Sequence, residues 1–269
     1  MPANELMLDP ESINYDVYPR DFRAVADGKL VIFGIPKCGN TWVQSLLCKY
    51  FGVEPVLTIE EFTSSGVLSI HDPYEPYMRE RPDFVSGFCL IRDIRDMIVS
   101  YFHYSNTDQW RHSMTRHYYD DFDSFYYEWF ISRCVPSHRL HTFASEFAER
   151  GVPIVRYERL NANPRFEFAR LLKRLGHEVD HERLRLVIEE HRLENLKRNG
   201  VYIRYRVEQT HFRKGGWGNF LDEMPPHILA DANERFGSYL KRWGYPIELS
   251  EESINTYRQQ LEDLARLQA

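Results

Sequence analysis

The chain has 269 residues, 43% of them hydrophobic, which is enough for one large α/β domain with a sizeable core. Its formal net charge of −6 argues against general nucleic-acid binding, although a local basic pocket is compatible with that charge. The polar N-terminus and the lack of a long apolar run predict neither a secretory leader nor a membrane span. The four cysteines lack the CxxC spacing of metal sites, so we expect a reduced, cytoplasmic protein without a metal.

The first predicted elements are an irregular N-terminal arm over residues 1–29, a buried strand over 30–35 and a helix from Trp42. Pro36, Lys37, Gly39 and Thr41 lie between the strand and the helix. A helix N-terminus offers unpaired N–H groups and the positive end of its dipole, so this turn suits an anion. We interpret it as a phosphate cradle, to which Lys37 adds a full charge and Thr41 a hydroxyl.

Further strand signals follow at 67–71, 87–92 and 151–157. The second of these leads into apolar residues at helical spacing, with Asp93 as a plausible N-cap. Repeated strand–helix units predict an α/β fold with a mostly parallel central sheet flanked by helices. Ligands are then expected at the carboxyl ends of the strands.

The rest of the chain is predicted to contain two long loops and several helices. The polar, aromatic segment 104–121 is expected to be an acceptor-site loop, and the glycine-rich segment 199–224 a cofactor-binding loop. Helices are predicted at 122–149 (two), 164–176, 181–196, 225–243 and 250–267.

The cradle differs from the common nucleotide P-loop. Gly34 and Gly39 have the spacing of G-x-x-x-x-G-K-[ST], but no lysine follows Gly39. Lys37 stands two residues before it instead. This change disfavours a P-loop small-molecule kinase, which we keep as an alternative.

Three segments resemble the cytosolic-type sulfotransferases, which use 3′-phosphoadenosine 5′-phosphosulfate (PAPS) and release adenosine 3′,5′-bisphosphate (PAP). Residues 36–42 are similar to the family's P-K-[ST]-G-[TN]-[TS]-W loop. Residues 90–103 are similar to its 3′-phosphate segment, with Arg92 and Ser100 eight residues apart. Residues 212–218 resemble its R-K-G-x-x-G loop. The resemblance implies one P-loop-like sulfotransferase domain over 1–269 that needs no metal.

The resemblance also implies roles for individual residues. Lys37 would contact the 5′-phosphosulfate, Trp42 and Tyr157 the adenine, and Arg92 with Ser100 the 3′-phosphate. The full expected cofactor site is Lys37, Cys38, Gly39, Asn40, Thr41, Trp42, Arg92, Ser100, Tyr157, Phe212, Arg213, Lys214 and Gly215. Each role has a plainer alternative: Trp42 in the core, Tyr157 at a rim, Arg92 paired with Asp96, Lys37 and the 213–214 pair as solvated surface residues.

His71 is the expected general base, and the expected catalytic set is Lys37, His71 and Ser100. His71 stands 21 residues before Arg92, as a family histidine does, and histidine suits proton transfer near neutral pH. The family's lysine two residues before it is replaced by Ser69. Glu60 and Glu61 are rival bases, and His103 aligns with a family histidine that is not usually the base.

Cys38 replaces the usual Ser or Thr of the loop. The helix N-terminus and Lys37 predict a lowered pKa for its thiol. No partner base is apparent in the sequence, so we interpret it as a small residue without a catalytic role.

The acceptor is expected to be a small molecule with a hydroxyl or amine, and the mixed polar composition suggests a polar natural product. The candidate pocket residues are Tyr74, Tyr77, Trp110, Tyr118 and Tyr119. A non-catalytic relative that only binds PAP is a further alternative. The family's K-T-V-E-like dimer signature is not visible at 220–226, so the oligomeric state stays open.

Overall fold

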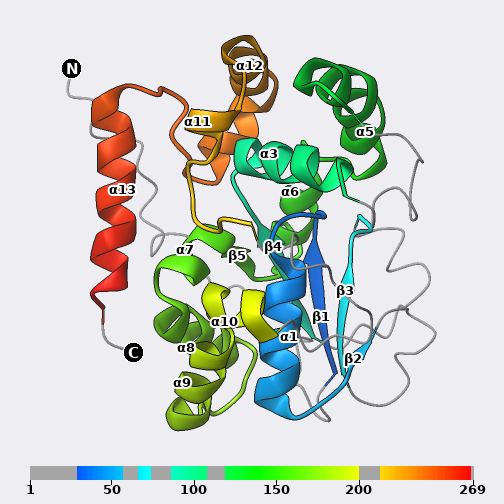
Figure 1. Ribbon diagram of the computed structural model, residues 1–269. Helices are drawn as coiled ribbons and strands as arrows, with labels where there is room; N and C mark the ends of the chain where they lie inside the picture. The colour runs from blue at the N-terminus through cyan, green and yellow to red at the C-terminus, as the bar shows by residue number, and fades with distance from the viewer. Residues whose placement is uncertain (1–28, 57–65, 74–85, 108–118, 200–212, 268–269) are drawn as a thin grey trace.

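A computed structural model describes residues 29–56, 66–73, 86–107, 119–199 and 213–267 (Figure 1). Its centre is a five-stranded sheet in the order β2-β3-β1-β4-β5, and every pair of neighbouring strands is parallel. The strands are β1 (Lys29–Gly34), β2 (Pro55–Val56), β3 (Gly66–Ile70), β4 (Gly87–Ile91) and β5 (Ile154–Arg156). The predicted α/β class with a parallel sheet is therefore confirmed.

Helices cover the sheet and extend beyond it. They are α1 (Asn40–Phe51), α3 (Ile94–Ser105), the π-helix η2 (Ser124–Cys134), α5 (Val135–Ser137), α6 (Phe143–Ala148), α7 (Tyr157–Ala162), α8 (Pro164–Arg174), α9 (His181–Glu190), α10 (Leu193–Asn199), α11 (Phe220–Glu223), α12 (Pro226–Arg242) and α13 (Glu251–Ala265). Helix α1 crosses in front of the sheet in Figure 1 and packs on β1, β3 and α9, whereas α6 packs on β4 and β5. Within the described residues, no helix combines the length and apolarity that crossing a membrane requires.

Strand β1 is central because its residues are apolar on both faces. Ile32 and Phe33 are fully buried, and the Phe33 ring lies 4.5 Å from that of Phe147 on α6, centre to centre. Successive side chains of a strand point to opposite faces, so Ile32 faces the side of α1. Since β3 and β4 flank β1, the strand order reverses at β1, and its carboxyl end is where ligands bind in such sheets.

Several predicted boundaries are wrong in detail. Helix α3 continues through Ser105, so the expected acceptor-site loop 104–121 begins later than predicted; its residues 108–118 lie outside the described residues. The expected helix over 181–196 is broken after Glu190, and α11 forms inside the expected loop 199–224. The strand predicted over 151–157 is shorter: β5 ends at Arg156, and α7 begins at Tyr157. The predicted helix start at Pro164 is confirmed.

Candidate active site

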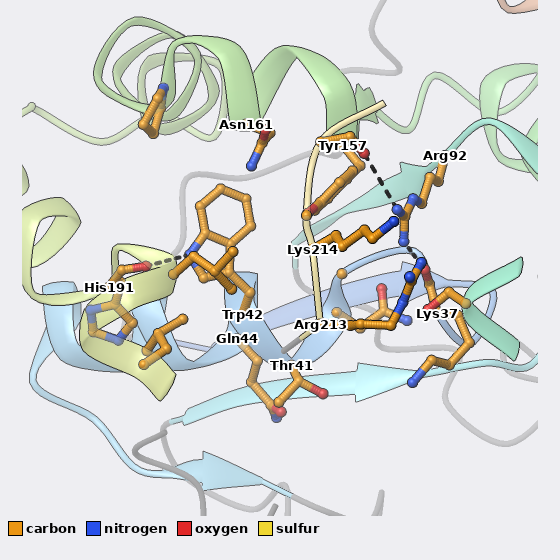
Figure 2. Close-up of a pocket in the computed structure, with 18 of the residues that line it drawn as sticks. Lys37, Thr41, Trp42, Gln44, Arg92, Tyr157, Asn161, His191, Arg213 and Lys214 are labelled. Carbon is orange, nitrogen blue, oxygen red and sulfur yellow. Dashed lines mark hydrogen bonds between the residues drawn. The ribbon is translucent and has the colours of Figure 1, made fainter. Parts of the chain in front are cut away.

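A cavity of about 800 Å³ opens at the carboxyl ends of β1 and β4 (Figure 2). Six Lys and Arg residues line it, and we call four of them the cationic cluster: Lys37, Arg92, Arg213 and Lys214. Figure 2 shows this cluster on one side of the cavity, with Trp42 and His191 on the other. The sequence-predicted Gly39, Asn40, Thr41, Ser100, Tyr157 and Gly215 also line it. The structure thus brings three distant segments to one place.

The cradle is a turn in a left-handed conformation. Lys37 has φ 72° and Gly39 has φ 96°, and a Cβ atom on Gly39 would come within 2.6 Å of the Tyr157 ring. Asn40 holds the turn against the strand, because its Nδ2 donates to the carbonyls of Gly34 (3.1 Å) and Ile35 (3.0 Å). None of the described side chains caps the N-terminus of α1, so the first-turn N–H groups suit an anion.

The surroundings of Lys37 disfavour its charged form. Burial and the nearby Arg92 guanidinium lower the pKa of Lys37 from 10.5 to about 7. Its Nζ lies 4.1 Å from the centre of the Tyr104 ring, whose face attracts a cation. An anion in the cavity would favour the charged form of this lysine.

Arg92 reaches the cavity from the end of β4. Its Nη1 donates to the carbonyl of Lys37 (3.1 Å) and its Nη2 to that of Gly216 (3.4 Å), and its guanidinium lies 4.6 Å from the centre of the Tyr157 ring. The expected alternative, an ion pair with Asp96, is not formed among the described residues. The Nε atom is buried with no hydrogen-bond partner in the described structure, so one donor remains for a ligand.

Trp42 both lines the cavity, as its expected contact with the adenine requires, and packs in the core, as the plainer alternative predicts. It lines the cavity, and its Nε1 donates to the carbonyl of His191 (3.1 Å). Its ring also packs edge-on against Tyr157 and Phe168, each at 5.9 Å between centres. The core contacts fix the indole at the wall of the cavity.

His71 follows β3 directly and lines the cavity beside the cradle. Its Nδ1 donates to the Gly34 carbonyl at 2.5 Å, which leaves Nε2 without a proton in the neutral ring. Burial lowers the pKa of His71, so the ring is neutral at pH 7. This arrangement can accept a proton at Nε2.

Two residues near the site carried no signal in the sequence. His138 donates from Nδ1 to the His71 carbonyl (3.2 Å), and the two rings are 6.5 Å apart. Glu223 accepts from both Arg213 and Lys214 at 2.7 Å. No local spacing relates His138 to His71, and both contacts depend on the tertiary fold.

Some expected residues are not brought to the cavity. Cys38 is fully buried next to Met97, and burial raises the pKa of its thiol, so the expected lowering is wrong. Its N–H already donates to the Ile35 carbonyl at 3.2 Å. Tyr119 packs against Phe125 instead of lining the cavity. The expected Tyr74, Tyr77, Trp110, Tyr118, Phe212, Glu60 and Glu61 lie outside the described residues.

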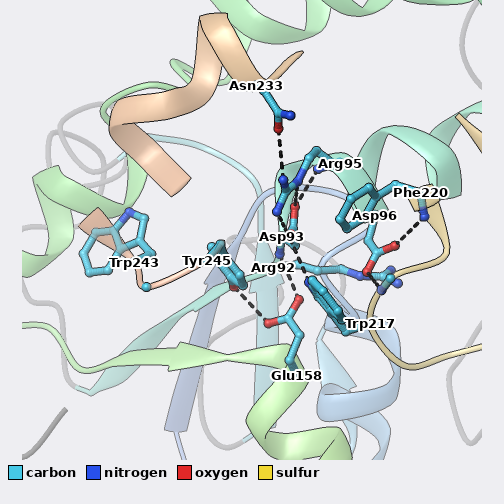
Figure 3. Close-up of polar contacts among 12 residues, drawn as sticks. Arg92, Asp93, Arg95, Asp96, Glu158, Trp217, Phe220, Asn233, Trp243 and Tyr245 are labelled. Atoms are coloured by element: carbon cyan, nitrogen blue, oxygen red, sulfur yellow. Dashed lines mark hydrogen bonds and ion pairs between the residues drawn. The ribbon is translucent and has the colours of Figure 1, made fainter. Parts of the chain in front are cut away.

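A buried polar network joins the loop after Lys214 to the start of α3 (Figure 3). Asp96 accepts from the backbone N–H groups of Gly218 (2.8 Å) and Phe220 (3.2 Å). Asp93 caps α3, forms a buried ion pair with Arg95 at 2.6 Å, and accepts from the Trp217 indole at 2.9 Å. These bonds fix the segment that follows the 213–215 part of the cavity wall.

Residues 87–244 match the model of the sulfotransferase domain. Mouse sulfotransferase SULT7A1, solved with PAP, has a TM-score of 0.63 and 15% identity, covering 90% of this chain and 91% of that chain. Retinol dehydratase, solved with PAP and either androsterone or retinol, has a TM-score of 0.55 and 16% identity, covering 84% of this chain and 83% of that chain.

At these identities the structural likeness establishes the fold alone. A search of curated protein sequences gave no significant match. The domain match extends over more than half of the chain and includes β4, α3, the 213–218 loop and α12. The protein therefore belongs to the sulfotransferase domain family.

Proposed function

We propose that this protein transfers a sulfuryl group from PAPS to a hydroxyl or amine of a small-molecule acceptor by in-line displacement, with His71 as general base. The observation that carries the proposal is the cationic cluster, which faces an uncapped helix N-terminus with a neutral histidine beside it. The matched family is one of sulfotransferases, and the similar mouse sulfotransferase and retinol dehydratase were solved with PAP. The family match also leaves the kinase alternative without support.

The cavity residues suit a ligand with two separate anionic groups. The N-terminus of α1 with Lys37 would hold the 5′-phosphosulfate, and Arg92, Ser100, Arg213, Lys214 and Gly215 the 3′-phosphate. The unpartnered Arg92 Nε and the close approach of Gly39 to Tyr157 support this fit. Trp42 and Tyr157 form a wall for the adenine. When bound, PAPS would supply the activated sulfuryl group.

Lys37 would stabilise negative charge on the bridging oxygen as the sulfuryl group departs. Such transfers need mainly positioning and charge stabilisation, much as phosphoryl transfers do. A partly desolvated lysine gives more of this stabilisation than one in water, because the local dielectric constant is lower.

His71 would take the proton of the acceptor at Nε2. The bond to the Gly34 carbonyl holds the ring and sets this tautomer. Ser69, two residues earlier on β3, lines the same cavity, and its Oγ is buried with no partner in the described part of the chain. We infer that this hydroxyl contacts the transferring group or a polar acceptor, in place of the family's lysine.

The donor is tested by thermal shift. PAP should raise the melting temperature without magnesium, and a shift with ATP and Mg²⁺ but none with PAP would overturn the proposal. The chemistry is tested with radiolabelled donor against a panel of hydroxyl and amine acceptors. Transfer to none of them, with PAP bound, would favour the non-catalytic relative.

The base is tested by His71→Ala. We expect this variant to bind PAP and to lose about 100-fold or more in kcat, the usual contribution of a general base. His227→Ala is the matched control, because His227 is exposed on α12 and pairs with Asp123 instead of facing the cavity. Full activity of the His71 variant would refute the base assignment and leave the family unaffected.

A further inference from the structure

Glu223, the last residue of α11, gathers three donors from two parts of the chain. Its Oε1 accepts from Arg213 Nη1 and from Lys214 Nζ, each at 2.7 Å. Its Oε2 accepts from Arg213 Nη1 at 2.8 Å and from His103 Nε2 at 2.6 Å. The carboxylate therefore holds half of the cationic cluster from outside the cavity, whose wall it does not form.

The environment of Glu223 makes this contact firmer than an ordinary surface ion pair. Its side chain is only 18% exposed, against 29% for Arg213 and 54% for Lys214. Hydrogen bonds from Lys214, Arg213 and His103 outweigh burial and lower the pKa of Glu223 to about 2. The carboxylate is thus charged throughout the physiological range.

The contact leaves donors for a ligand. Among the bonds to described residues, Arg213 uses only Nη1 of its three nitrogens, and Lys214 uses one contact of an ammonium with three N–H groups. Both side chains also line the cavity. Glu223 can therefore keep its bonds while the remaining N–H groups face an anion.

Glu223 stands on a firm support, whereas the two cations stand on a glycine-rich turn. Helix α11 is anchored by the buried Phe220, whose N–H donates to Asp96 at 3.2 Å. Gly215 and Gly216, which follow the cations, have φ of 68° and 73°. Ordering a long, free Arg or Lys side chain costs conformational entropy, and a fixed carboxylate removes part of that cost before a ligand arrives.

We propose that Glu223 is a positioning residue for the 3′-phosphate: it holds Arg213 and Lys214 in place for that group. His103, one turn after Ser100 on α3, also bonds the carboxylate, at Oε2. The inference rests on the proposed function, in which Arg213 and Lys214 bind the 3′-phosphate. Nothing in the sequence around Glu223 indicates this role.

The test compares two ligands that differ only in the 3′-phosphate: PAP and adenosine 5′-monophosphate. Their dissociation constants are measured by calorimetry, directly for PAP and by displacement for the monophosphate. We expect Glu223→Ala to weaken PAP binding about tenfold and to leave monophosphate binding unchanged. The ratio of the PAP dissociation constant to the monophosphate dissociation constant then rises about tenfold. General damage to the fold would weaken both ligands and leave the ratio the same.

Asp222→Ala is the matched control, because it removes the same charge at the residue next to Glu223. The Asp222 side chain is exposed and forms no ion pair in the described structure. An unchanged ratio for Glu223→Ala, or tighter PAP binding because the carboxylate competes with the phosphate, would overturn the inference.

Arg213→Ala separates the inference from the proposal beneath it. If Arg213→Ala raises the ratio of the PAP constant to the monophosphate constant and Glu223→Ala does not, only the role of Glu223 fails. If neither variant changes the ratio, the assignment of the 3′-phosphate to this loop fails as well.

Discussion

The most informative perturbation of this site is pH, because Lys37 has a pKa of about 7. At that pH half of the molecules carry the charged lysine in the absence of ligand. An anion next to Nζ favours the charged form and moves the pKa back towards its usual 10.5. PAP binding should therefore take up a proton, and the affinity should fall as pH rises above 7.

The size of the effect follows from the two pKa values. If binding restores the ordinary pKa, the dissociation constant scales with one plus ten to the power of pH minus pKa. Between pH 7 and pH 9 the factor grows from about 2 to about 100, a loss of about fiftyfold in affinity. Proton uptake should be about 0.5 per PAP at pH 7 and about 0.9 at pH 8.

Calorimetry in two buffers of different ionisation enthalpy measures the uptake directly. Lys37→Met should bind PAP more weakly and lose the uptake over this range. Lys49→Met is the charge-matched control, since Lys49 is exposed at the other end of α1 and pairs with Glu190. Absence of uptake in the unmodified protein, or full uptake in Lys37→Met, would refute the reasoning.

Three further outcomes are expected. Lys37→Gly should raise the melting temperature by about 2–4 °C, because φ 72° costs a non-glycine residue about 1 kcal/mol; an unchanged or lower melting temperature would contradict this. The same variant should abolish transfer, because it removes the lysine ammonium group. Asp96→Ala should lower the free energy of unfolding in urea by about 3 kcal/mol, because the N–H groups of Gly218 and Phe220 lose their acceptor; a loss below about 1 kcal/mol would disagree. His191 is buried and its pKa is lowered by burial, so its contribution is complete above pH 6.5 and declines below it as the unfolded chain takes up the proton. Melting temperature should thus fall between pH 6.5 and 5, less so in His191→Gln, and an equal fall in both would argue against this histidine.

The phosphate cradle was predictable because its signals are local. The apolar run of β1, the turn residues and the start of α1 follow one another without a break, and the structure confirms this order. The repeated strand–helix units predicted the parallel pairing of β1 with β3 and β4. In such a sheet the ligand site and its loops gather at the carboxyl edge of the strands.

Other features depend on contacts between distant segments. Local charge predicted a lowered pKa for Cys38, but the fold buries its thiol, and desolvation reverses the direction. The break after Glu190 places His191 where Ser45 and Trp42 bind it, a requirement that helical periodicity does not contain. Glu223 likewise acquires His103 as a partner only when α3 and α11 come together.

The Gly34 carbonyl links Asn40 and His71, two parts of the site that lie 31 residues apart in the sequence. It accepts from Asn40, which holds the cradle, and from His71, the proposed base. Changes at Asn40 and His71 should therefore combine non-additively, as they do for groups that act as one unit. For the same reason, divergence towards new acceptors is easiest on the side of the cavity away from β1, because a shift of this strand end would disturb donor binding and proton transfer together.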